Sequence, residues 1–78
     1  METKTIGEQR VRVEFNPERI SYVDEIKQKT AELINLINNS MHKPSLSDEE
    51  IREFLRLKEL AMTSYEEAAM WAVKSATF

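Results

Sequence analysis

A long helical pattern of apolar residues follows an Asn-Pro pair and most strongly constrains the fold. Apolar side chains and one threonine recur about every 3.5 residues, the spacing of one packed helix face: Val23, Ile26, Thr30, Leu33 and Ile37. Asn16 can cap free backbone N–H groups, and Pro17 is tolerated at the first helical position. The pattern predicts a long packing helix over residues 17–40.

A second helix start follows a loop that contains Pro44. Ser47 and Glu50 have the spacing of a capping box, in which each side chain bonds the other residue's backbone N–H. Apolar residues continue at helical spacing after this start, so we expect a second helix over residues 47–62.

Two hydroxyl residues then interrupt the pattern. Thr63 and Ser64 each stand three residues before a glutamate, which again resembles a capping box. We therefore expect the second helix to kink or break here, with a third helix over residues 64–77. Its alanines give a smooth face that lets another backbone approach closely: Ala68, Ala69, Ala72 and Ala76.

The N-terminal segment has a different pattern. Charged and apolar residues alternate from Arg10 to Phe15, a period of two that suits an extended chain with one apolar face. A single strand cannot form a sheet. We therefore expect residues 1–15 to be an extended arm laid across helices of the same subunit or a neighbour.

The size of the chain bears on its assembly. With 78 residues it is a single domain, 1–78, and a domain of this size buries only about 60% of the surface that its unfolded chain exposes. It has no cysteine, so neither a disulfide nor the usual zinc site can supplement the core. We therefore predict an all-α fold, a helical hairpin that associates into an oligomeric bundle.

Composition also limits the function. The net charge of −3 disfavours DNA or RNA as a partner, since non-specific nucleic-acid binding needs broad basic surfaces. No apolar run approaches the roughly 20 residues that cross a bilayer, and the polar N-terminus lacks a signal-peptide core. We expect a cytoplasmic protein that does not bind membranes.

No residues suggest catalysis. The one histidine, His42, falls in the predicted loop without a cysteine or a convincing pair of base and nucleophile. The acidic clusters at 48–50 and 66–67 are explained by helix starts, where carboxylates stabilise the dipole. We expect no enzymatic activity, no metal and no cofactor.

Two segments resemble a known family. The ending SYEEAAMWAVKSA resembles the closing helix of the phage anti-CBASS sponge proteins, which sequester the cyclic oligonucleotides that bacterial defences use as alarm signals. The segment YVDEIKQKTAELINLI, after an FNP turn, is similar to that family's long ligand-lining helix. The resemblance implies trimers interlocked into a homohexamer in the host bacterial cytosol. It also implies binding of cyclic dinucleotides such as cGAMP between protomers, and in some members of cyclic trinucleotides near the threefold axis.

The resemblance also implies a dinucleotide site. Phe15 is the candidate for the aromatic residue on which a base stacks, although the family has a tyrosine-like residue at this place. Asn16 stands beside it. Either Lys27 or Lys29 would contact phosphate. One residue turns a helical side chain by about 100°, so only one of the two lysines is expected to face the pocket. Without the resemblance, both would be interpreted as solvated surface residues.

A trinucleotide site is implied at the other helix. Lys74 falls where the family has an arginine, with Ala72 on the same turn and Thr30 able to add a hydroxyl. A lysine lacks the bidentate fork of arginine. Trp71 is interpreted first as a core residue that fills a junction between protomers and second as a ligand platform.

One alternative function comes from a different class. The chain could be a helical oligomer that binds another protein through its acidic helices or through Arg10 and Arg12 of the arm, with no nucleotide ligand.

Overall fold

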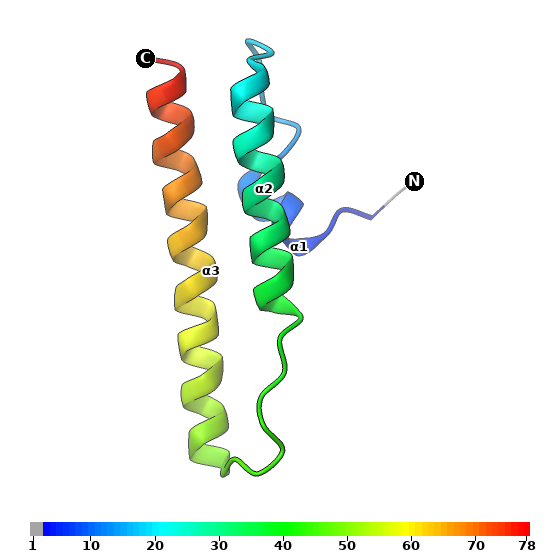
Figure 1. Cartoon of the computed structure of the whole chain (residues 1–78), viewed down its shortest axis with the longest axis vertical. Coiled ribbons are helices and arrows are strands. Elements are labelled where there is room, and N and C mark those ends of the chain that lie inside the picture. Colours follow the sequence, from blue (N-terminus) through cyan, green and yellow to red (C-terminus); the bar gives the residue numbers. More distant parts are fainter. Residues whose placement is uncertain (1–2) are drawn as a thin grey trace.

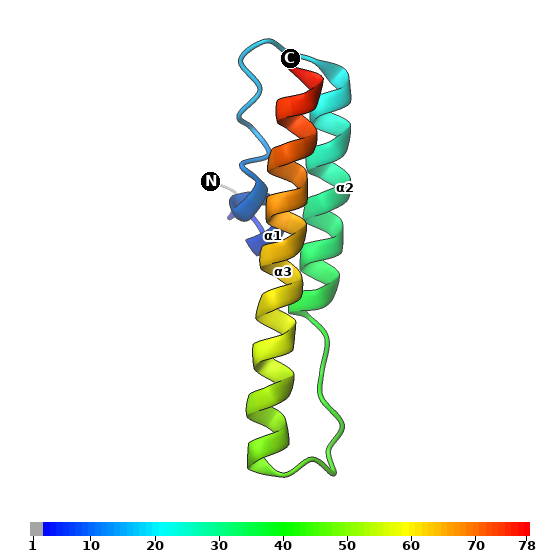
Figure 2. The ribbon, with the colours of Figure 1, turned by 90° about the vertical axis from the view of Figure 1, so that its left-hand side faces the viewer.

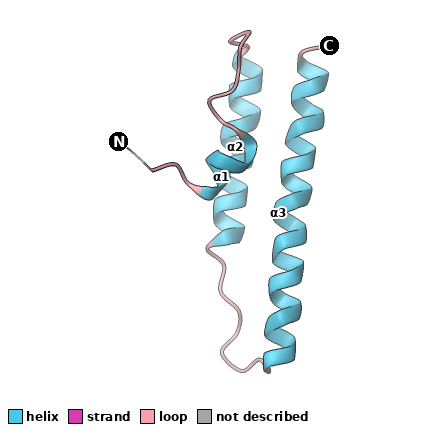
Figure 3. Ribbon diagram, turned by 180° about the vertical axis from the view of Figure 1, so that it is seen from behind, coloured by secondary structure: helices cyan, strands magenta, loops and turns pink. Residues whose placement is uncertain are grey.

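The computed structural model describes residues 3–78, in which there are three helices and no strand (Figure 3). Helices α2 (Ser21–Asn38) and α3 (Asp48–Ala76) run antiparallel and side by side as a hairpin (Figure 1). The short helix α1 (Ile6–Val11) lies at the side of the hairpin (Figure 2). It packs mainly against α2 and also contacts α3. The predicted all-α hairpin is confirmed.

Helix α3 begins where the sequence predicts and continues through the predicted interruption. Ser47 Oγ accepts from the Glu50 N–H at 3.2 Å, and Glu50 Oε1 accepts from the Ser47 N–H at 2.9 Å. The predicted break at Thr63 is wrong, because α3 runs unbroken to Ala76. The Thr63 hydroxyl accepts from Arg10 Nη2 at 3.2 Å instead of capping a helix, and the buried Met62 beside it holds this turn against the core.

Helix α2 begins at Ser21, later than the predicted start at Pro17. Arg19 has a φ of 53°, in the left-handed region, which a continuing helix cannot contain. Asn16 therefore stabilises a turn and does not cap a helix: its Oδ1 accepts from the Ile20 N–H at 3.1 Å, and its Nδ2 donates to the Ile20 carbonyl at 2.7 Å.

The predicted extended arm contains α1, so that prediction is wrong for residues 6–11; residues 1–2 lie outside the described part of the chain. Thr5 and Glu8 form a capping box at its start. At its end Arg12 has a φ of 55°, and the N–H of Val13 donates to the Glu8 carbonyl at 3.1 Å, as in a Schellman motif. This turn places Val11 and Val13 both in the core, so the alternation reflects burial and not an extended chain.

Helix α1 approaches α2 closely at the chain's one glycine. The Gly7 N–H donates to Asn35 Oδ1 at 2.7 Å, and Asn35 Nδ2 donates to the Thr5 hydroxyl at 3.0 Å. A Cβ built on Gly7 would lie 2.1 Å from the Ala31 carbonyl oxygen, so no larger residue fits without displacement of a helix.

An ion-pair cluster joins α1 to α3. Arg10 Nη2 lies 3.1 Å from Glu59 Oε1 and 3.3 Å from Glu66 Oε2, and its side chain is only 17% exposed. The buried core takes residues from all three helices and from the loop after α1: Val11, Val13, Ala31, Ile34, Met62 and Ala69. The loop after α1 is therefore fixed at one end by packing and by charge.

Large apolar side chains of α3 remain exposed. Trp71 is 59% exposed, Leu57 52% and Leu60 50%. The N-terminal end of α3 extends past α2 (Figure 1). Trp71 is therefore outside the core of the single chain, and the expected oligomer stays a prediction. None of the described helices combines the length and apolar character that a bilayer crossing needs.

Candidate functional site

Residues 12–20, which we call the Phe15 loop, connect α1 to α2 and carry Phe15 and Asn16, two of the four predicted dinucleotide residues; Lys27 and Lys29 lie on α2. The Phe15 side chain is 56% exposed. The Arg12 Cζ atom lies 4.7 Å from the centroid of the Phe15 ring, and Lys27 Nζ lies 5.4 Å from it. The Phe15 N–H donates to the Arg12 carbonyl at 2.8 Å. The loop thus presents one aromatic ring with two positive groups beside it.

Lys27 lies beneath the loop and is only 5% exposed. Its ammonium donates to the Arg12 carbonyl at 3.0 Å and also to the Phe15 carbonyl. Burial lowers the pKa of Lys27, as does the nearby charge of Arg12, while Asp24 acts in the opposite direction. Lys29 is exposed on another face of α2, so Lys27 is the lysine at the loop.

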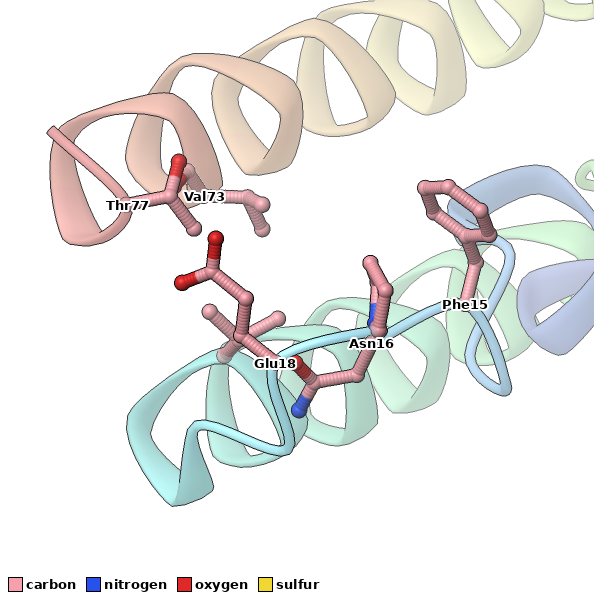
Figure 4. Close-up of a pocket in the computed structure, with 7 residues that line it drawn as sticks. Phe15, Asn16, Glu18, Val73 and Thr77 are labelled. Carbon is pink, nitrogen blue, oxygen red and sulfur yellow. The ribbon is translucent and has the colours of Figure 1, made fainter.

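A cavity of about 220 Å³ lies between the Phe15 loop, the first turn of α2 and the end of α3. Figure 4 shows its main residues, with the Glu18 carboxylate directed toward α3: Phe15, Asn16, Glu18, Val73 and Thr77. The loop and the C-terminal turns of α3, distant in sequence, are therefore adjacent here.

A second cavity of about 300 Å³ lies on the α1 side of the loop. Its walls include Arg12, Glu14 and Phe15, so Phe15 borders both cavities. The Glu14 carboxylate is paired with Lys4 Nζ at 2.8 Å, and Glu8 Oε1 accepts from the Thr5 N–H at 2.9 Å. Both carboxylates are thus engaged within the cavity wall.

The predicted trinucleotide residues are not joined by any described contact within one chain. The Thr30 hydroxyl donates to the Ile26 carbonyl at 2.7 Å, and Ala72 is half-buried on α3. Lys74 is exposed, with its Nζ 5.4 Å from the centroid of the Trp71 ring.

Two residues need a different description from the one that the sequence suggests. Arg12 was predicted only as part of an arm, although its place three residues before Phe15 is the signal that could have identified it. His42 packs edge-on against Phe54 with ring centroids 5.8 Å apart, and its Nδ1 lies 2.8 Å from the Lys43 carbonyl.

Across residues 3–78, no three metal-ligating side chains lie close enough together to hold a metal ion.

Comparison with known families gives the affiliation. Residues 6–77 match the family described as Acb2/Tad1, hairpin domain. The chain belongs to the Acb2/Tad1 hairpin family. This is the anti-CBASS sponge family, whose members are binding proteins and not enzymes, so the resemblance seen in the sequence is confirmed. The Acb2/Tad1 match spans all three helices and the Phe15 loop. No curated protein and no solved structure matches the chain significantly.

Proposed function

We propose that this protein binds and sequesters cyclic dinucleotides such as cGAMP, and thereby blocks CBASS defence without altering the ligand. The observation that carries the proposal is the family match over residues 6–77, which includes the Phe15 loop. An exposed aromatic ring between two cavities, with cations beside it, is the kind of surface that nucleotides bind.

The binding energy would come from two kinds of contact. Stacking of a base on an aromatic ring is worth about 1–3 kcal/mol, and Phe15 is exposed enough to accept a base. A positive group then compensates the charge of the phosphodiester. Such contacts need no nucleophile, so the ligand leaves the site intact.

We also propose that the site is completed by assembly. Trp71, Leu57 and Leu60 together expose apolar surface that a small soluble chain would gain from covering with further copies of itself. A homohexamer of interlocked trimers would repeat the single Lys74 by symmetry and bring it near Thr30 and Ala72 of other copies. That convergence is the arrangement in which a cyclic trinucleotide could bind.

Titration calorimetry with 3′,3′-cGAMP tests the proposal. We expect saturable heat with the wild type and weaker binding with Phe15→Ala, because the stacking surface is lost. Tyr65→Ala, which removes another exposed ring from α3, serves as the matched control and should bind like the wild type. After denaturation the nucleotide should be recovered whole by chromatography, and linear product would instead indicate a phosphodiesterase.

The exposed apolar residues of α3 also favour the alternative, a protein-interaction module. A stable oligomer that gives no heat with any cyclic di- or trinucleotide would support that alternative and contradict the sponge function.

A further inference from the structure

The two cations beside the Phe15 ring differ in what they already bind. Lys27 is buried, and its ammonium donates to the carbonyls of Arg12 and Phe15. Two of its three N–H donors are thus engaged, and because Lys27 is only 5% exposed, a phosphate could reach the third only if the loop opened. Lys27 is therefore already committed to holding the Phe15 loop in place.

Arg12 is in the opposite situation. It is exposed and lies in the wall of the 300 Å³ cavity, with its guanidinium over the Phe15 ring at 4.7 Å. The ion pairs among residues 3–78 involve Lys4, Arg10 and Arg56, so no described carboxylate neutralises Arg12. Its guanidinium is thus available to an anion in the cavity.

The backbone of Arg12 supports a functional reason for this residue. Its φ of 55° places it at the left-handed position of the Schellman motif that ends α1. Glycine is the usual residue at that position, because a Cβ costs energy there. Residues other than glycine that are held in such a strained backbone conformation cluster at binding sites, where the side chain is needed.

We propose that Arg12 is the cation that contacts the phosphodiester of a bound cyclic dinucleotide, and that Lys27 is a positioning residue that holds the Phe15 loop. This inference rests on the proposed function and identifies the residue that neutralises the phosphate charge of the ligand. A guanidinium offers bidentate donors to phosphate, and the neighbouring ring offers a face to a base. Arg12 and Phe15 together supply both contacts within four consecutive residues.

The first experiment measures the affinity of 3′,3′-cGAMP for Arg12→Gln at low and high salt. We expect a loss of affinity of about tenfold or more, since a charge-assisted hydrogen bond is removed. We also expect a flatter dependence of affinity on salt, because one ion contact is absent. Arg52→Gln, which removes the same charge from an exposed position near the start of α3, is the matched control and should bind like the wild type.

Arg12→Gly separates binding from folding. Glycine relieves the left-handed strain, so the melting temperature should rise, while the loss of the guanidinium should weaken binding as in Arg12→Gln. A variant that is more stable and binds less well cannot be explained by a damaged fold.

The role of Lys27 is measured by hydrogen exchange in the ligand-free protein. Lys27→Met should speed exchange of the Val13 and Phe15 amides, and should weaken binding while the dependence of affinity on salt stays as in the wild type. Lys27→Arg keeps N–H donors for the loop carbonyls and should recover part of the affinity.

Three results would overturn the inference. Wild-type affinity and salt dependence in Arg12→Gln would show that Arg12 does not contact phosphate. If Lys27→Met leaves amide hydrogen exchange in the loop unchanged and flattens the dependence of affinity on salt, then Lys27 is the residue that contacts phosphate. A wild-type protein that binds no cyclic dinucleotide would contradict the proposed function as well, whereas the first two results contradict this inference alone.

Discussion

Replacement of Gly7 by alanine tests the packing that positions the Phe15 loop. The new Cβ would lie 2.1 Å from the Ala31 carbonyl oxygen and 2.7 Å from Asn35 Oδ1, where real contacts stay above 3.0 Å. The Ala31 oxygen belongs to the backbone of α2 and cannot rotate away. Helix α1 must therefore shift outward, which also disturbs the hydrogen bond from the Gly7 N–H to Asn35.

The expected loss of stability follows from three terms. Overpacking of a filled site costs about 1–3 kcal/mol, and the disturbed hydrogen bond adds about 1 kcal/mol. Alanine recovers about 1 kcal/mol of helix propensity relative to glycine. We expect a net decrease of about 2 kcal/mol in the free energy of unfolding, which lowers the melting temperature by roughly 8–16 °C for a domain of this size.

Thermal unfolding followed by circular dichroism, at one fixed protein concentration, measures this change. Asn35→Ala is the control, because it removes both hydrogen bonds of the Asn35 side chain, from the Gly7 N–H and to the Thr5 hydroxyl, without adding an atom between the helices, and it should lower the melting temperature less. If Gly7→Ala melts at or above the wild-type temperature, α1 does not approach α2 closely enough for a Cβ to clash with the Ala31 carbonyl.

Three further changes test other contacts. The Ser47 N–H and hydroxyl hold the pKa of Glu50 below its ordinary value of 4.5. The ionised Glu50 therefore stabilises the fold above pH 4.5, and this stabilisation is lost as the pH falls through the lowered pKa of the folded protein. In Glu50→Gln the melting temperature should decline less on acidification below pH 4.5. Arg10→Gln should lower the free energy of unfolding in urea by about 1–3 kcal/mol, because its half-buried partner Glu66 loses a charged donor. Trp71→Ala should keep the helical circular dichroism signal but reduce the mass seen by light scattering, and an unchanged mass would place the interface elsewhere.

Local signals predict the one helix start that agrees with the structure, at Ser47, and also explain the errors. The capping box of Ser47 and Glu50 involves residues three apart, so it can be recognised without the fold. Thr5 and Glu8 carry the same signal, but the alternating residues that follow indicate an extended arm. Thr63 has the spacing of a cap as well, yet its hydroxyl bonds Arg10 from another helix, a contact that no local pattern contains.

The candidate site is predictable only in part. Phe15 and Lys27 are indicated by the family resemblance, and the structure does bring them within 5.4 Å, measured from the ring centroid to Nζ. The position of Arg12 three residues before Phe15 is visible in the sequence, but its place in the cavity wall depends on a left-handed backbone that arginine rarely adopts, which no local pattern predicts. The burial of Lys27 likewise depends on loop carbonyls supplied from twelve and fifteen residues away.

Because the Lys27 amine is buried beneath the Phe15 loop, its chemical reactivity in the wild-type protein reports opening of the loop. Amine-reactive reagents attack neutral, accessible amines, and Lys27 is 5% exposed with its nitrogen held by two carbonyls. The exposed Lys29, two positions along the same helix, provides an internal reference for reagent and time. The ratio of labelling at Lys27 to labelling at Lys29, measured by mass spectrometry on the wild-type protein, therefore reports how often the Phe15 loop opens.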